Sequence, residues 1–366
     1  MPERLAFTVA LIALAALQAC RQHDTRPAPQ VQSATPTQPA SATPEIERWA
    51  PPAHPASVVY TPEIERLVAA IASGNRVEGS AVGFAGTPSA QWENYQRLKE
   101  LASVAQLIAL TDHENAAVRC YTFEALAAKD SEHVFEVLLK HLGDTEIVDT
   151  QSGCIVMQMC TADYFVEAVT LGGSGHQLNP IERERLGQIL LNSRTPKLSA
   201  RTWALDAMKP IAGNYARVRE IAVEERDRAA LRLLAKYRNH ADVELISTFF
   251  AHESERVAAL FAAREFPDPA FYPLVTQLFE QAWGKGDFSG VEWRLSYQVL
   301  AQYPRPRTLA LFERTLSVKE EFSRKQLEDA LLTAITKYPN ELFEPLKSKM
   351  PPRPPPDANT PIESDD

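Results

Sequence analysis

The amino-acid sequence predicts an all-α body built from repeated helix hairpins. Glycine is scarce, at 14 of 366 residues, whereas leucine and alanine are abundant, a composition that favours helices over sheets. Between residues 59 and 350, apolar residues recur at spacings of three and four, separated by short polar loops, and strand-like alternation is nearly absent. Leu110 and Leu142, like Asp112 and Asp144, lie 32 residues apart. This period is typical of helical arrays.

The first twenty residues have the order of an export signal. Arg4 gives a weakly positive start, offset in part by Glu3, and residues 5–17 form an apolar run of 13 residues. A membrane-spanning helix needs about 20 such residues, so this run is too short to span a bilayer. Its length fits the hydrophobic region of a secretory signal. We therefore predict that residues 1–19 are a cleaved signal peptide.

The end of the apolar run, Leu17-Gln18-Ala19-Cys20, resembles the lipobox of bacterial lipoproteins. The resemblance implies that Cys20 is acylated, with palmitate among its chains, and becomes the first residue of the mature protein, although smaller residues than Gln18 are commoner at that place. An ordinary signal peptide with a chance cysteine is the alternative. Arg21 stands where an aspartate would retain such a lipoprotein at the inner membrane. The resemblance therefore implies a lipid-anchored protein of the cell envelope, at the outer membrane and facing the periplasm.

Two segments are predicted to be disordered, residues 20–58 and residues 351–366. Both are rich in proline and poor in large apolar residues, so they cannot bury enough surface to offset the entropy of ordering. We expect the first to be a tether between lipid and body and the second to be an acidic tail, for which a proline-rich docking motif is an alternative. The hexapeptide TPEIER occurs at residues 43–48 and again at 61–66, where Thr-Pro is expected to start the first helix.

Around Asp112 the repeated unit takes a recognisable form. One apolar helix is expected to end at Leu110, the turn carries Asp112, and Val118-Arg119 open the next helix. This pattern resembles a HEAT-like repeat, although the turn is one residue longer than usual and the next unit lacks the arginine. The resemblance implies an α-solenoid of six or seven helix pairs over residues 59–350, and a tetratricopeptide-like array is the alternative.

The same repeat predicts how the cysteines are placed. The second unit is expected to turn at Gly143-Asp144 and to continue as a helix from about Ser152 through Val169. Stacked helices lie 8–10 Å apart and point equivalent residues the same way, which does not suit a disulfide between Cys120 and Cys154. Cys154 and Cys160 would be separated by about 9 Å of helical rise. Although exported proteins often form disulfides, we expect three free, largely buried thiols.

Charge and motifs argue against several classes of function. The net charge of −9 argues against nucleic acid, which requires a basic surface. His133 and His141 lie eight residues apart, too far to hold one metal ion without a further ligand, and the sequence has no His-x-x-x-His or Cys-x-x-Cys motif. It has no Gly-x-Ser-x-Gly nucleophile motif either. We therefore assign no catalytic residue, metal or cofactor. Asp112 and Arg119 are expected to tie a turn to the next helix.

Two features are candidates for binding a partner. Arg228, Arg232 and Lys236 are spaced four apart on one predicted second helix, where they form a basic stripe. Second helices line the concave side of HEAT-like arrays, so the stripe could meet an acidic group, and a solvated face is the ordinary alternative. Phe84 lies in the glycine-rich stretch 79–88, which lacks the lysine of a phosphate loop and has no predicted strand before it. We expect a structured loop there, and loops concentrate function.

These features predict a non-enzymatic, lipid-anchored protein that binds another protein or acts as a scaffold through a helical-repeat surface. A more specific form of this hypothesis is an immunity-type lipoprotein that neutralises an exported toxin. Two alternatives remain open. One is a periplasmic enzyme acting on cell-wall glycan or peptide, whose paired carboxylates would converge only in three dimensions. The other is a purely architectural envelope protein. In each case contact with the membrane is expected through the lipid alone.

Overall fold

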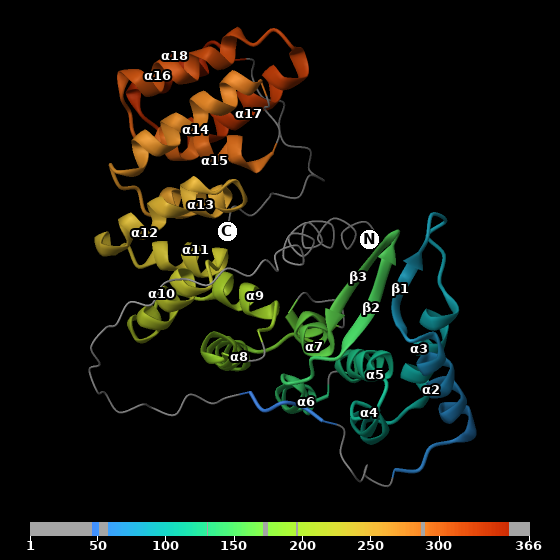
Figure 1. Ribbon diagram of the computed structural model, residues 1–366. Helices are drawn as coiled ribbons and strands as arrows, with labels where there is room; N and C mark the ends of the chain where they lie inside the picture. The colour runs from blue at the N-terminus through green and yellow to red at the C-terminus, as the bar shows by residue number, and fades with distance from the viewer. Residues whose placement is uncertain are drawn as a thin grey trace, which may run out of the picture. The chain divides into compact units, whose positions relative to one another are not determined.

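The computed structural model describes residues 46–50, 58–129, 131–170, 175–194, 197–286 and 290–350. This part of the chain is mostly helical, with seventeen α-helices and one three-stranded sheet (Figure 1). The chain divides into two compact units, Met1–Ala204 and Leu205–Asp366, here called unit 1 and unit 2. The predicted helical class is confirmed, but the sheet was not predicted. The expected signal peptide, Cys20 and the acidic tail lie outside the described residues.

Unit 1 contains the sheet and the helices around it. Thr61 caps the first helix by accepting a hydrogen bond from the Ile64 backbone N–H, as the second TPEIER copy predicts. Ser103 and Gln106 form a reciprocal capping box at the start of another helix. The elements are α2 (Pro62–Gly74), β1 (Arg76–Val82), α3 (Ala90–Leu101), α4 (Val104–Leu110), α5 (Ala116–Ala128), α6 (Val134–His141), β2 (Ile147–Gly153), β3 (Ile155–Cys160), α7 (Thr161–Thr170) and α8 (Pro180–Asn192), with α9 (Ala200–Ala207) crossing the boundary between the units.

The sheet has the order β1-β2-β3, with β1 parallel to β2 and β2 antiparallel to β3. The expected helix beginning near Ser152 is therefore wrong. Ser152 pairs with Ile155 across a two-residue turn in which Gly153 has a φ of +58°, a conformation that glycine adopts without strain. The run Ile155-Val156-Met157 suits a strand that is half buried, and the helix begins only at Thr161.

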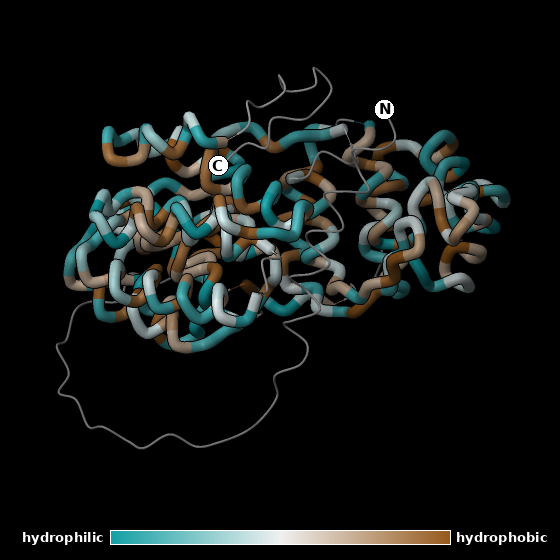
Figure 2. The backbone as a smooth tube through the Cα atoms, turned by 90° about the horizontal axis from the view of Figure 1, so that it is seen from above, coloured by the Kyte–Doolittle hydropathy of each residue, from teal (hydrophilic) through white to brown (hydrophobic). Residues whose placement is uncertain are grey.

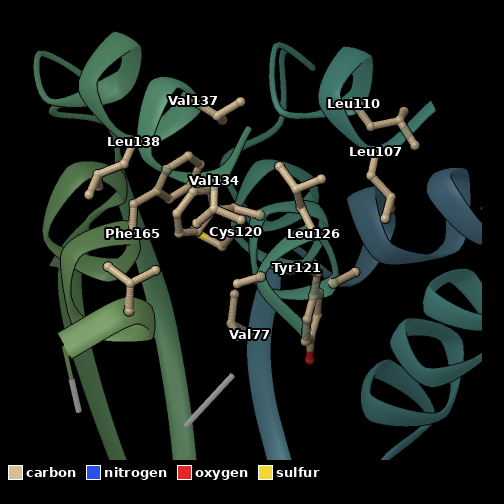
Figure 3. Close-up of a cluster of buried hydrophobic side chains, with 14 of the residues drawn as sticks. Val77, Leu107, Leu110, Cys120, Tyr121, Leu126, Val134, Val137, Leu138 and Phe165 are labelled. Carbon is tan, nitrogen blue, oxygen red and sulfur yellow. The ribbon is translucent and has the colours of Figure 1, made fainter. Parts of the chain in front are cut away.

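The core of unit 1 lies around α5, which is buried along nearly its whole length. A helix that is apolar all round is stable only when it is surrounded. Helices α3 and α7 pack on either side of it, in the order α3, α5, α7. Cys120 and Leu126 of α5 pack in this core with Leu107, Val134 and Phe165 from neighbouring elements (Figure 3).

Unit 2 consists of helices α10 (Tyr215–Glu224), α11 (Arg228–Lys236), α12 (Val243–Thr248), α13 (Arg256–Glu265), α14 (Phe271–Lys285), α15 (Val291–Ala301), α16 (Pro306–Glu313), α17 (Glu321–Lys337) and α18 (Glu344–Lys347). Alternate helices contact one another in the order α11, α13, α15, α17, and α10, α12 and α14 each lie against the helix that follows. Hydrophobic and hydrophilic stretches alternate along the described backbone, as the amphipathic packing of helices requires (Figure 2). Aromatic rings fill the core, with Phe279 edge-on to Trp293 and to Tyr297.

Residues 46–50 lie against unit 1, which corrects the expectation of an unpacked tether from 20 to 58. The Trp49 backbone N–H donates to the Gly143 carbonyl oxygen over 3.2 Å. The approach is so close that a Cβ on Gly143 would lie 1.8 Å from the Glu47 carbonyl oxygen. Position 143 therefore requires glycine, because the backbone of this segment occupies the space of a side chain. The rest of the expected tether up to residue 57 lies outside the described residues.

Candidate protein-binding surface

One end of the sheet presents an apolar side chain to solvent. Phe84 follows β1 and has a relative exposure of 108%, which means that nothing in the described residues covers it. Its loop is held by backbone hydrogen bonds on both sides. The Val82 N–H donates to the Thr87 carbonyl oxygen over 3.0 Å, and the Gly83 N–H donates to the Gly153 carbonyl oxygen over 2.8 Å. The loop is thus fixed both to itself and to the turn between β2 and β3.

Two glycines allow this loop to turn back within a few residues. Gly83 has a φ of +68° and Gly86 a φ of +61°, in the left-handed region that other residues adopt only with strain. The Gly86 N–H then donates to the Gly83 carbonyl oxygen over 3.3 Å. The loop was expected from the glycine spacing. Strand β1 precedes it directly, which was not expected.

The outer strand of the sheet adds to this surface. Strand β3 has the uncharged sequence IVMQMC, and Val156 in it is 52% exposed. No strand in the described part of the chain pairs with its outer edge. The opposite edge of the sheet is capped, because the Tyr121 hydroxyl bonds both the backbone N–H and the carbonyl oxygen of Glu78. An open, uncharged edge strand can accept a further strand from a partner.

We use the name sheet tip for Phe84, Val156 and the outer edge of β3 together. Val156 pairs with Gln151, two residues from the turn to which the Phe84 loop is bonded. The glycine spacing pointed to Phe84. Val156 and the β3 edge were missed because residues 152–160 were expected to be helical. The one feature of the sequence that points to a strand here is the uncharged apolar run before Thr161.

The predicted basic stripe on α11 is engaged within unit 2. The Arg232 guanidinium forms a hydrogen-bonded ion pair with the Asp206 carboxylate, with an N–O distance of 2.6 Å. The Lys236 ammonium donates to the Asp206 carbonyl oxygen over 3.3 Å. Arg228 also takes part in an interaction. The stripe therefore does not present three unpaired cations, and the sheet tip is the stronger candidate surface.

Asp112 and Arg119 do not pair with each other. Arg119 is fully buried and donates to the carbonyl oxygens of His113 and Glu114, over 2.8 and 2.9 Å. It also forms a two-pronged ion pair with Asp144, over 2.8 and 3.1 Å. These contacts join the turn to the next helix, which agrees with the structural role expected for Arg119. The Asp112 carboxylate instead pairs with Lys140.

A half-buried acid, Glu124, was not singled out from the sequence. It lies on α5, and the Tyr164 hydroxyl donates to its carboxylate. Burial raises the pKa of this carboxyl, even though hydrogen bonds from Tyr164 and Tyr95 and the charge of Lys99 lower it. The group faces packed tyrosines, and Tyr95 is only 2% exposed. The only sequence signal was one glutamate in an otherwise apolar helical segment.

The three cysteines of the described residues are free, as expected. The expected burial holds for Cys120 alone, since Cys154 is exposed and Cys160 is half-buried. Burial and, after it, the charge of the nearby Asp163 carboxylate together raise the pKa of the Cys160 thiol to about 12. A thiol with this pKa stays protonated at neutral pH and is a poor nucleophile.

In the described residues no group of three or more His, Cys, Asp and Glu side chains is placed to hold a metal ion. None of the helices described is both long and apolar enough to cross a membrane. No protein-family model matches the chain, and neither a curated protein nor a solved structure matches it.

Proposed function

We propose that this chain binds another protein through the sheet tip. The observation that carries the proposal is the full exposure of Phe84 on a loop that glycines and backbone hydrogen bonds hold in place. Burying a phenylalanine side chain stabilises a complex by roughly 1.5–3 kcal/mol. Aromatic residues are enriched in protein interfaces. Because the loop is already ordered, a partner that covers Phe84 loses little entropy in fixing it.

The helices, in this proposal, form a HEAT-like solenoid that acts as a rigid frame for binding. Support comes from the order of packing in unit 2, where α11, α13, α15 and α17 contact one another in turn. Stacked helix hairpins produce this order, because each hairpin buries its apolar face against the next. Helices α3, α5 and α7 of unit 1 pack in the same manner.

The proposed location is the cell envelope, with the protein anchored through acylated Cys20 at the outer membrane and facing the periplasm. The support is the order of apolar run, alanine and cysteine at residues 5–20. Substitution of Cys20 by alanine should abolish incorporation of labelled palmitate and release the protein from the membrane fraction. Labelled palmitate in the variant would refute the anchor. Within this location the protein acts as a scaffold, and the immunity-type role is the version in which the partner is a toxin.

Photo-cross-linking tests the binding function directly. A benzophenone amino acid is placed at position 84, and in a control chain at position 322, where Phe322 on α17 is 69% exposed. After irradiation of intact cells, position 84 should give one adduct of defined mass with another protein, and position 322 should not. The absence of an adduct at position 84, or the same adducts at both positions, would contradict the proposal.

A further inference from the structure

Unit 2 contains an open groove that the proposed protein-binding function does not use. Its volume is about 500 Å³, and it lies between one face of α14 and the start of α16. Helix α14 contributes Tyr272 and Thr276, and the start of α16 contributes Arg305 and Arg307. We propose that this groove binds an oxyanion, the carboxylate or phosphate group of a ligand.

The two arginines provide the positive charge. The Arg305 guanidinium carbon lies 4.2 Å from the centroid of the Tyr272 ring. Stacking of this kind holds the plane of the guanidinium while its N–H edges stay available, and the planar fork matches the oxygens of a carboxylate or phosphate. Within the described ranges, neither Arg305 nor Arg307 forms an ion pair with a carboxylate. Both side chains are exposed and can reach a ligand.

The start of α16 adds backbone donors. Arg305 is the N-cap residue, and no side chain caps this end of the helix. The first turn of any helix leaves its N–H groups without acceptors in the helix, and Pro306 has none to offer, so the N–H groups of Arg307 and Thr308 remain. Their partial positive charge favours an anion at this end of the helix.

Thr276 supplies an independent indication of a ligand. It lines the groove and is only 2% exposed, yet its hydroxyl has no hydrogen-bond partner in the part of the chain that the structure describes. Buried polar groups are almost always hydrogen-bonded, so an unpartnered hydroxyl at a groove calls for a partner.

The carboxylate in the groove lining already has a partner outside the lining. The Glu280 carboxylate pairs with the Arg314 guanidinium over 2.5 Å, so it does not neutralise Arg305 or Arg307. The groove is thus locally positive in a chain whose net charge is −9. The ligand that this arrangement suits is acidic, and it comes either from a separate molecule or from the acidic residues Glu363, Asp365 and Asp366 of this chain, which lie outside the described residues.

Calorimetric titration of the full chain carrying Cys20→Ala tests the site, with inorganic phosphate and an acetylated Asp-Asp amide as probes. At least one probe should bind. The double substitution Arg305→Gln and Arg307→Gln should weaken binding at least about tenfold, and Thr276→Val should weaken it in the same direction. The control, Arg324→Gln with Lys325→Gln on α17, removes the same charge and should leave binding unchanged. Circular dichroism confirms that each variant is folded.

A second arm identifies the source of the oxyanion. Neutralising the tail with Glu363→Gln, Asp365→Asn and Asp366→Asn should raise probe affinity at least about tenfold if the chain's own tail occupies the groove. It should leave affinity unchanged if the ligand is a separate molecule. Equal binding by the groove and control variants, or no binding of either probe in both the intact and the tail-neutralised chain, would overturn the proposal.

Discussion

The indole ring of Trp49 lies over the guanidinium group of Arg119, with the guanidinium carbon 4.4 Å from the ring centroid. Arg119 is fully buried and paired with Asp144, so Trp49 covers one side of a buried ion pair. The Trp49 ring also lies 5.0 Å from the ring of His141. A short segment before the first helix therefore contributes to the core of unit 1.

Removal of this aromatic ring should lower the stability of unit 1. A desolvated cation–π contact contributes up to about 2 kcal/mol, and in a unit of this size each kcal/mol shifts Tm by about 2–4 °C. We expect Trp49→Ala to lower Tm by about 4–8 °C in scanning calorimetry. Gly143→Ala should also lower Tm, because its methyl group would collide with the Glu47 carbonyl oxygen.

Two controls accompany this measurement. Val59→Ala alters a side chain that is 87% exposed and should leave Tm unchanged. Deletion of residues 24–44 should have no effect either, whereas deletion of residues 24–56 should reproduce the effect of Trp49→Ala. If the longer deletion leaves Tm unchanged, the packing of residues 46–50 does not contribute to stability.

The ion pair of Arg119 and Asp144 should be far more sensitive to substitution than an exposed pair. Both side chains are buried, at 0% and 1% exposure, so Arg119→Ala leaves a carboxylate buried without its partner. The free energy of unfolding should fall by about 3–5 kcal/mol in urea titration. Arg97→Ala breaks exposed pairs with Glu63 and Glu100 and should lower it by no more than about 1 kcal/mol. Equal losses in the free energy of unfolding for Arg119→Ala and Arg97→Ala would contradict the claim that the buried ion pair is the more sensitive one.

Glu124 should make stability depend on pH. Its pKa is raised in the folded protein, so the protonated carboxyl favours folding, and that contribution is lost as pH rises through the folded pKa. Glu124→Gln keeps the hydrogen-bond acceptor and removes the ionisation. The stability of the wild type minus that of the variant, measured by urea titration, should therefore fall as pH rises through the raised pKa of Glu124. A difference that is constant or rises with pH would show that folding does not raise the pKa of Glu124.

The cysteines should differ in reactivity toward a thiol reagent. In the native Cys20→Ala chain, Cys154 should react first because it is exposed, and Cys120 should react only after denaturation. Cys160 should react slowly at neutral pH, since burial raises its pKa to about 12. Denatured, unreduced protein should yield three thiols. A yield of one thiol would reveal a disulfide and contradict the assignment of three free thiols.

Local sequence predicted the features that depend on neighbouring residues. The cap at Thr61 and the apolar spacing of α4 and α5 follow from contacts within a turn or two. Residues 152–160, which form the end of β2, the turn and β3, were mistaken for the start of a helix because a short apolar run suits either structure. What stabilises the hairpin of β2 and β3 as a sheet is pairing with β1, whose Val77 lies beside Thr150 in the register, 73 residues later in the sequence.

The candidate sites show the same limit. The glycines around Phe84 predicted a structured loop, because their conformational role is local. The basic stripe on α11 was overestimated, since Asp206, which pairs with Arg232, comes from the preceding α9 rather than from α11. The contact of Trp49 with Arg119 joins residues 70 positions apart, and no local pattern reveals it.

The central claim is that Phe84 anchors a protein partner, and the most direct test is the dissociation constant of the partner captured at position 84. Aromatic anchors at interfaces cost about 2 kcal/mol or more when truncated, so Phe84→Ala should weaken binding by at least about 30-fold in surface plasmon resonance. Phe322→Ala, which removes another exposed phenylalanine, should change it by less than about twofold. An unchanged dissociation constant for Phe84→Ala, with the partner still bound, would contradict the account.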